Sequence, residues 1–180
     1  MIKRLLTLIA IILSAVCSTY AQPCSTIPGM SPGNALPVCG TSVFHQDVVI
    51  NCSGNNVAQV GCSVGASSES SFWYKFTCFQ TGSLGFLISG ISSTDDYDWV
   101  LFDITGRNPN EVFSNSSLAI SINLYGAGNG PAPFPESPTG CRPGATGNVH
   151  CEGSDNGNTP FNAMPTITIG HSYLLMVTNW

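Results

Sequence analysis

The fold is decided by residues 71–106, SFWYKFTCFQTGSLGFLISGISSTDDYDWVLFDITG, and the rest of the chain is organised around them. Side chains of a β-strand alternate between its two faces, so residues 72–79 read as a strand that is buried on at least one face. A second period-two run follows a Thr-Gly-Ser turn at residues 84–88, and a third run covers Trp99 to Ile104. We therefore expect an antiparallel β-meander of three strands.

The aromatic side chains of this stretch are expected to form the hidden side of the sheet. Alternation divides the first strand into two faces, one with Phe72, Tyr74, Phe76 and Cys78 and the other with Trp73, Lys75, Thr77 and Phe79. Rings on such a strand favour core packing over stacking on a sugar. An exposed ring is expected instead at Tyr125 or Phe134, because the Pro/Gly-rich loop around them cannot bury both of its sides.

The first 21 residues have the layout of a secretory signal peptide. Lys3 and Arg4 precede an apolar run from Leu5 to Cys17, and Ala21 offers a cleavage site. The run is shorter than the roughly 20 residues that a membrane-spanning helix needs, so no membrane span is expected. A lipoprotein with Cys17 as its lipidated first residue is the alternative. The remaining chain divides into a Pro/Gly-rich segment, 22–37, and a β-sandwich domain, 38–180.

The charge of the exported part argues against nucleic acid as a partner. Beyond residue 21, three Lys or Arg side chains stand against ten acidic residues, which gives a net charge near −7. Nucleic acids and anionic membranes both require clustered Lys and Arg. Charged residues make up 8% of the chain against a typical value of about 25%, so neutral polar groups must keep it in solution.

The rest of the chain is expected to add strands to the same domain. One or two short strands are expected in Val38–Ile50, and Val57–Val60 is a further candidate. Residues 118–124 alternate as a half-buried strand, and two more strands are expected at 166–169 and 173–177. Residues 125–165 contain seven of the twelve prolines and are expected to be a structureless connection. A sandwich that stops directly after the last strand would leave an edge uncovered, so a longer protein is expected.

Cysteine usage indicates an oxidising compartment. Eight cysteines are present, and Cys17 leaves with the signal peptide. Spacing favours three local disulfides, although six cysteines allow 15 patterns. The expected pairs are Cys24 with Cys39, Cys52 with Cys62, and Cys141 with Cys151. Cys78 would then be a small buried apolar residue.

Three motifs together resemble a family of bacterial surface proteins. They are Trp73-Tyr74-Lys75-Phe76, Asp96-Tyr97-Asp98 and the closing Tyr173-Leu174-Leu175-Met176-Val177. Over roughly residues 35–180 the chain resembles the amino-terminal domain of large surface proteins from gliding bacteria that use type IX secretion. It is more distantly similar to the bacterial pre-peptidase C-terminal domain, which implies a jelly-roll β-sandwich. The chain lacks the sorting domain of such proteins.

The acidic cluster Asp95, Asp96, Asp98 and Asp103 is the strongest candidate for a cofactor, namely Ca²⁺. Calcium takes six to eight oxygen ligands, and carboxylates at a strand entry could supply several. Asp at a turn also caps backbone amides, and the spacing is not that of an EF-hand. A second oxygen-rich loop at residues 152–158 is a weaker candidate and reads equally well as a tight turn.

No catalytic site is expected. Gly61-Cys62-Ser63-Val64-Gly65 matches the G-x-S-x-G nucleophile motif, which has meaning only between a strand and a helix. The residues after it are poor helix formers. The three histidines, His45, His150 and His171, have no spacing that implies a triad or a metal site.

The sequence thus predicts an all-β domain of jelly-roll type, exported and disulfide-bonded, without catalytic activity. The expected function is adhesion or ligand binding at the cell surface or outside the cell, with an extracellular glycan or protein surface as partner and further domains on the same polypeptide. The alternatives are a structural spacer or cap, and an accessory domain of a larger secreted hydrolase.

Overall fold

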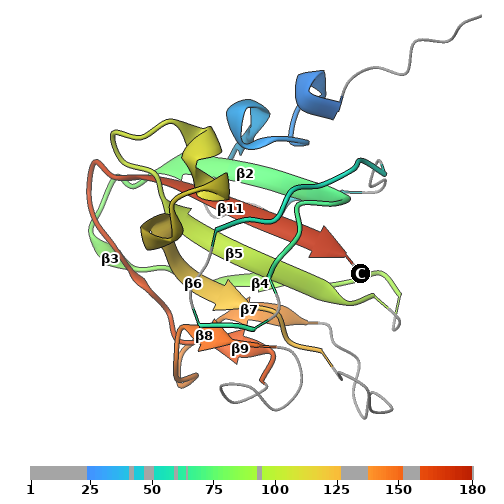
Figure 1. The fold of residues 1–180 in the computed structure, drawn as a ribbon. Coiled ribbons are helices and arrows are strands. Elements are labelled where there is room, and N and C mark those ends of the chain that lie inside the picture. Colours follow the sequence, from blue (N-terminus) through green and yellow to red (C-terminus); the bar gives the residue numbers. More distant parts are fainter. Residues whose placement is uncertain are drawn as a thin grey trace, which may run out of the picture.

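A computed structural model describes residues 24–40, 43–46, 51–58, 61–63, 65–92, 95–126, 138–151 and 159–179. The strands are β1 (Leu36–Pro37), β2 (Ser71–Thr77), β3 (Gly82–Ser83), β4 (Phe86–Ile88), β5 (Tyr97–Asp103), β6 (Ala119–Asn123), β7 (Thr139–Cys141), β8 (Val149–His150), β9 (Phe161–Asn162), β10 (Thr166–Ile167) and β11 (Ser172–Asn179). The helical elements of these residues are short 3-10 turns, η1 (Cys24–Thr26), η2 (Pro32–Asn34), η3 (Pro109–Phe113) and η4 (Ser116–Leu118). The expected all-β fold is confirmed (Figure 1).

A six-stranded sheet in the order β1-β2-β11-β5-β6-β8 forms the frame of the molecule (Figure 1). Its three long strands, β2, β11 and β5, are rich in aromatic and large aliphatic residues, which pack well on a pleated surface. The strand β11 pairs antiparallel with both of its neighbours, so that Leu175 lies opposite Tyr74 on β2 and Leu101 on β5. β11 and β5 carry apolar side chains on both faces of the sheet, whereas on β2 the face of Trp73 also carries the exposed Lys75 and Thr77.

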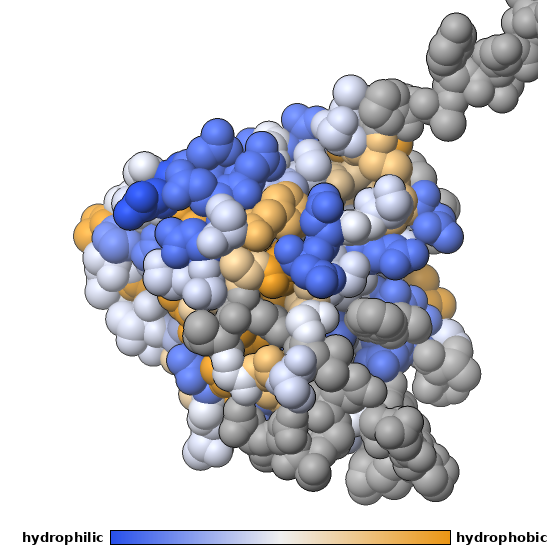
Figure 2. Space-filling view, in the orientation of Figure 1, coloured by the Kyte–Doolittle hydropathy of each residue, from blue (hydrophilic) through white to orange (hydrophobic). Residues whose placement is uncertain are grey.

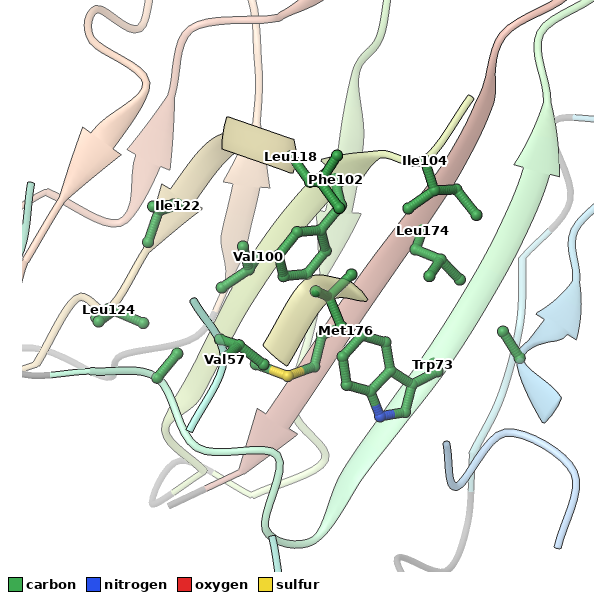
Figure 3. Close-up of a cluster of buried hydrophobic side chains, with 13 residues drawn as sticks. Val57, Trp73, Val100, Phe102, Ile104, Leu118, Ile122, Leu124, Leu174 and Met176 are labelled. Carbon is green, nitrogen blue, oxygen red and sulfur yellow. The ribbon is translucent and has the colours of Figure 1, made fainter. Parts of the chain in front are cut away.

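One face of this sheet is covered by loops and 3-10 turns. The strands contribute Trp73, Val100, Phe102, Ile122, Leu174 and Met176, all at most 1% exposed (Figure 3). Val57 and Ala66 from the preceding loop, Val112 from η3 and Leu118 from η4 close over them. The outside of this cover is largely hydrophilic over η3 and η4, with smaller apolar areas between polar ones (Figure 2).

The opposite face packs against two smaller sheets, which makes the fold β-sandwich-like. A three-stranded sheet in the order β4-β7-β9 and a two-stranded sheet of β10 and β3 supply this second layer. Trp99 on β5 is fully buried beneath Phe86 on β4, with 4.9 Å between the ring centroids. The indole N–H of Trp99 donates to the hydroxyl of Thr139 on β7 at 3.0 Å, which fixes the two layers on each other.

The expected meander is wrong, although its strands all form. β2 and β5 both run antiparallel to β11, which lies between them, and β4 belongs to the other layer. β2 and β5 are therefore parallel to each other, and parallel strands cannot be joined by a hairpin. The chain between them leaves the large sheet, forms β3 and β4, and then returns. Period-two alternation identifies a strand but carries no information about its neighbour.

Two expectations for the carboxyl-terminal half need correction. The last strand, β11, is a central strand and not an edge. The expected structureless connection at 125–165 contains β7, β8 and β9. β7 has a glycine in its middle because Gly140 has φ +139° and a Cβ there would collide with the carbonyl oxygen of Phe86. Such short strands leave no periodic signal.

The remaining strand predictions have mixed outcomes. The strand at 118–124 is confirmed as β6, but it is buried on both faces, because Ser121 and Asn123 are 0% exposed. Both polar residues bond to Asn162 on β9. Residues 43–46 and 57–58 form no strand, and 47–50, 59 and 60 lie outside the described residues, as do the signal peptide and Phe134. No helix among the described residues is long and apolar enough to cross a membrane.

The three expected disulfides are wrong in their pairing. The bonds are Cys24–Cys52 and Cys62–Cys151, and the thiols of Cys39, Cys78 and Cys141 are free. The structure joins segments that pack together rather than segments close in sequence: the loop that contains Cys62 lies against β8, where a Cβ on Gly61 would touch Val149. Cys78 is buried, as expected. Burial raises the pKa of Cys141 to about 12, against a smaller lowering effect of a hydrogen bond with Ser121, so this thiol stays protonated.

Candidate functional site

A large groove opens where the second layer stops short of β2 and β11. Its volume is about 760 Å³, within the range of about 300–1,000 Å³ that is typical of ligand sites. All three residues of β4 line it, and the residues of β7 do not, so the groove lies along the edge of β4 that faces away from β7. The groove is thus a part of the sandwich that the second layer leaves uncovered.

The floor of the groove is the large sheet itself. It consists of Tyr74 and Phe76 from β2, Leu175 and Val177 from β11, and Tyr97 and Leu101 from β5. The strand register places these side chains in rows, since Tyr74, Leu175 and Leu101 lie opposite one another across three strands. Cross-strand neighbours point to the same face. The result is a continuous apolar and aromatic surface.

The two walls are chain segments far apart in sequence. Residues 84–89 and Ile91 form one wall, and residues 38–40 and 43–46 form the other. Large apolar side chains on both walls remain in contact with water: Val43 is 79% exposed, Phe44 50%, Leu87 63% and Ile91 89%. Phe79, at one end of the groove, is 85% exposed. Such a concentration of exposed apolar side chains around one hollow is the usual mark of an interaction site.

The described lining of the groove is neutral apart from one histidine, His45. Among the described residues that line it, Asp, Glu, Lys and Arg are all absent. Burial, and then repulsion from Tyr97, raises the pKa of Tyr74. The pKa of Tyr97 is also raised, first by burial and then by the charge and hydrogen bond of Asp95, so both phenols are neutral at physiological pH. Gln46, Gln80 and Asn179 add neutral hydrogen-bonding groups, and His45 adds an imidazole.

The four aspartates predicted as a calcium site do not lie together. Asp95, Asp96 and Asp98 are at the start of β5, and Asp103 is its last residue, about 16 Å further along at roughly 3.3 Å per residue. Asp95 accepts hydrogen bonds from the Ser92 amide at 3.0 Å and the Asn179 side chain at 3.4 Å. Within the described residues no three His, Cys, Asp or Glu side chains are grouped as for a metal. Calcium binding at the first three stays a prediction, and residues 152–158 lie outside the described residues.

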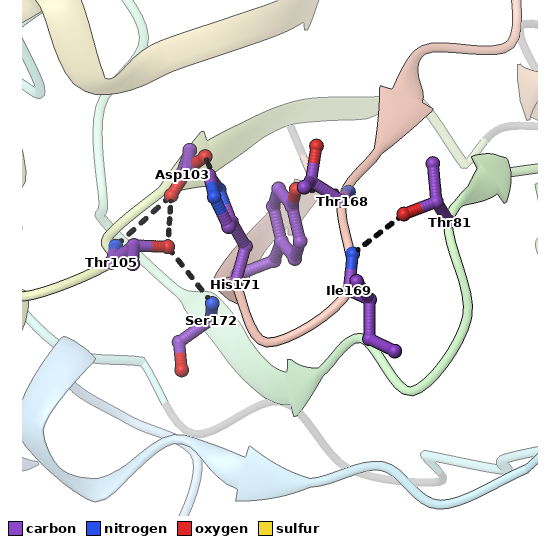
Figure 4. A network of polar contacts seen from close by, with 8 residues as sticks. Thr81, Asp103, Thr105, Thr168, Ile169, His171 and Ser172 are labelled. Atoms are coloured by element: carbon purple, nitrogen blue, oxygen red, sulfur yellow. Dashed lines mark hydrogen bonds and ion pairs between the residues drawn. The ribbon is translucent and has the colours of Figure 1, made fainter.

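Asp103 instead joins two strand ends in a polar network (Figure 4). Its carboxylate contacts the His171 Nδ1 atom at 2.8 Å and accepts hydrogen bonds from the amide and the hydroxyl of Thr105, at 3.0 and 2.6 Å. The Ser172 amide in turn donates to the Thr105 hydroxyl at 3.0 Å. Burial alone would raise the pKa of Asp103, but the hydrogen bonds from Thr105 and His171 and the charge of His171 lower it overall.

We expect this carboxylate to make stability depend on pH under acidic conditions. Because the pKa of Asp103 is lower in the folded than in the unfolded state, its contribution is fully present above the ordinary aspartate pKa of 3.8 and is lost as pH falls through the folded value. Urea unfolding should show Asp103→Asn to be less stable near neutral pH by at most about 1 kcal/mol, because the side chain is 28% exposed and screened by water. This deficit should shrink towards about pH 2.

The matched control is Glu69→Gln, which changes an exposed carboxylate outside the network. Near neutral pH it should leave the unfolding free energy within about 0.5 kcal/mol of that of the original chain. A deficit of Asp103→Asn that is constant across the acidic range would contradict a contribution from the charge of this carboxylate.

The other sequence candidates do not form a site with one another. Cys62, within the G-x-S-x-G match, is in a disulfide, and the described residues after it form no helix, so the geometry of a nucleophile elbow is not present there. His150 contacts the carbonyl of Thr146 at 3.0 Å, and His171 bonds to Asp103. His45 lines the groove.

Sequence reasoning missed the groove because it had assigned the groove's residues to a closed core. The nearest signal was the pattern of the wall segment LGFLISGI (residues 84–91). Apolar residues occupy both its odd and its even positions, whereas a strand with one face in solvent needs them only at every second position. Comparisons with protein-family models, with curated proteins and with solved structures found no match for this chain.

Proposed function

We propose that the chain is a non-catalytic ligand-binding module of a secreted or cell-surface protein, and that the groove is its binding site. The observation that carries the proposal is an apolar hollow of about 760 Å³ whose described lining contains no Asp, Glu, Lys or Arg and whose walls keep apolar side chains exposed. Exposure of this kind costs free energy in water and is offset when a partner covers it.

The frame around the groove supports a role outside the cell. The two disulfides are of a kind that persists in oxidising compartments. The partner would be an extracellular glycan or protein surface. The resemblance to surface proteins of gliding bacteria supports adhesion as the role of this binding. The proposed role requires only the rigid floor of β2, β11 and β5 and the exposed walls.

A binding experiment with two matched variants tests this proposal. The purified chain is applied to immobilised extracellular glycans and matrix proteins. Ile91→Lys places a charge on the wall of the groove, at a residue 89% exposed, so the fold should tolerate it. Ile169→Lys makes the same change at a residue 61% exposed that does not line the groove.

We expect the first variant to lose at least tenfold in affinity and the second to bind as the original chain does, because a desolvated unpaired charge is costly. Absence of binding to every surface would overturn the adhesive role. Equal losses in both variants would overturn the groove as its site.

A further inference from the structure

We infer that the occupant of the groove is an extended polypeptide segment with uncharged inward side chains, which adds as a further strand of the small sheet to the free edge of β4, the edge with which no described strand pairs. This inference rests on the proposed function and names the class of its partner. The inference is based on two neighbouring features, the edge strand β4 and the apolar floor of the groove beside it. Strand addition at an exposed sheet edge is a general mode of peptide recognition.

The backbone pattern of β4 leaves hydrogen-bonding groups on the groove side. In an antiparallel pair, alternate residues point their N–H and C=O groups to the partner strand and the others point away. Gly140 on β7 donates its N–H to Pro160, on the side away from β4, so its pair with Leu87 is a non-hydrogen-bonded one. Leu87 consequently points its own N–H and C=O away from β7, along the edge that borders the groove.

The floor accommodates the side chains that such a strand would present. Phe86 and Ile88 pack into the sandwich, and the intervening Leu87 side chain is 63% exposed. A strand beside β4 would follow the same pleat and direct every second side chain onto Tyr74, Leu175 and Val177. β4 covers three residues of the wall at 84–89, so the added strand would centre its pairing on Leu87.

The absence of charge on the described lining defines the partner's inward side chains. Ionised side chains buried there would find no counter-charge, which is strongly unfavourable. Aliphatic residues at alternating positions, especially Val, Ile and Leu, suit both the floor and the extended backbone. The outward positions are free to be polar, because they lie beside the exposed Leu87. The partner is therefore an apolar-alternating segment of another protein.

Paired synthetic peptides separate strand addition from general apolar binding. The probe is a capped peptide that alternates valine and threonine, with a lysine at each end for solubility. Two isomers carry backbone N-methyl groups, one on the valines and the other on the threonines. In a strand, the amides of successive residues point to opposite edges, so only one isomer loses the N–H groups that face β4.

We expect calorimetry to show binding of the parent peptide and a loss of about tenfold or more for one isomer only. The sensitive isomer also reveals the direction of the added strand. Equal affinity of the two isomers overturns strand addition, whether both bind or both fail.

A change on the protein side completes the test. Leu87→Pro removes the N–H on the free edge, which an edge strand tolerates, whereas Leu87→Ala shortens the side chain and keeps the N–H. We expect the proline variant to lose affinity for the parent peptide by several-fold or more beyond any loss in the alanine variant, which measures the side-chain contribution of this wall residue. An unchanged melting temperature is the check on folding, and a proline variant that loses no more than the alanine variant overturns strand addition.

The proposed function fails separately from this inference. If the peptides do not bind while immobilised glycans still distinguish Ile91→Lys from Ile169→Lys, the groove remains a binding site and strand addition is wrong. If no surface and no peptide binds, both proposals fall.

Discussion

Removal of the Cys62–Cys151 disulfide is expected to lower the free energy of unfolding by about 4 to 5 kcal/mol. The bond joins residues 89 apart in sequence, and the Cys24–Cys52 bond joins residues 28 apart. A longer closed loop removes more entropy from the unfolded chain, so the second bond should contribute about 1 kcal/mol less. The two loops do not overlap, so the two effects should add.

Urea unfolding of two double variants measures this difference. Cys62→Ala with Cys151→Ala removes the longer loop, and Cys24→Ala with Cys52→Ala is the matched control. The ordering should be seen in the free energy of unfolding of the oxidised proteins, and dithiothreitol should abolish it. If the control were the more damaging change, packing around η1 and η2 would dominate over loop closure and the entropic account would be wrong.

The sequence predicted those elements whose signal is local. Alternation of large apolar residues identified β2, β5, β6 and β11, because each strand is long enough to show period two. The same reasoning failed for β7, β8 and β9, which have two or three residues each. A strand of that length shows no period, and its position is set by partners such as Asn123 and Asn162, which bond across the layers at 2.6 Å.

Strand order and disulfide pairing could not be predicted because both depend on contacts between distant segments. Spacing suggested that Cys52 would pair with its near neighbour Cys62. The chain instead places Cys62 beside β8, and Cys52 packs with Met30 and Phe72 near η2. The three long strands likewise gave no sign that β11 would lie between β2 and β5.

The candidate site was hidden from the sequence for the same reason. Its floor joins residues from β2, β5 and β11, and its walls come from segments about forty residues apart in the chain. Most of these side chains, taken one by one, are of apolar or aromatic types that are common in a buried core. The groove exists because the second layer ends at β4 and does not extend over β2 and β11. Tyr74, Leu175 and Val177 are therefore left partly exposed.

Trp73→Ala is the other change with a large expected effect, a loss of about 3 to 5 kcal/mol in the free energy of unfolding. The Trp73 ring is 0% exposed, stacks on Phe102 with 6.1 Å between centroids and 22° between planes, and meets Phe113 edge-on at 6.0 Å. Its removal would leave a cavity between the large sheet and the cover formed by η3. Trp73→Phe should lose less than half as much, since it keeps a ring in the site.

Phe79→Ala is the matched control because strict alternation would place Phe79 on the same face as Trp73. β2 ends at Thr77, and the Cys78 amide turns to bond the carbonyl of His171 at 2.8 Å, so Phe79 leaves the sheet and is 85% exposed. Its replacement should change stability by no more than about 0.5 kcal/mol. Comparable losses in Trp73→Ala and Phe79→Ala, measured by urea unfolding, would mean that the buried face of β2 continues beyond Thr77 and that the end of the groove is closed.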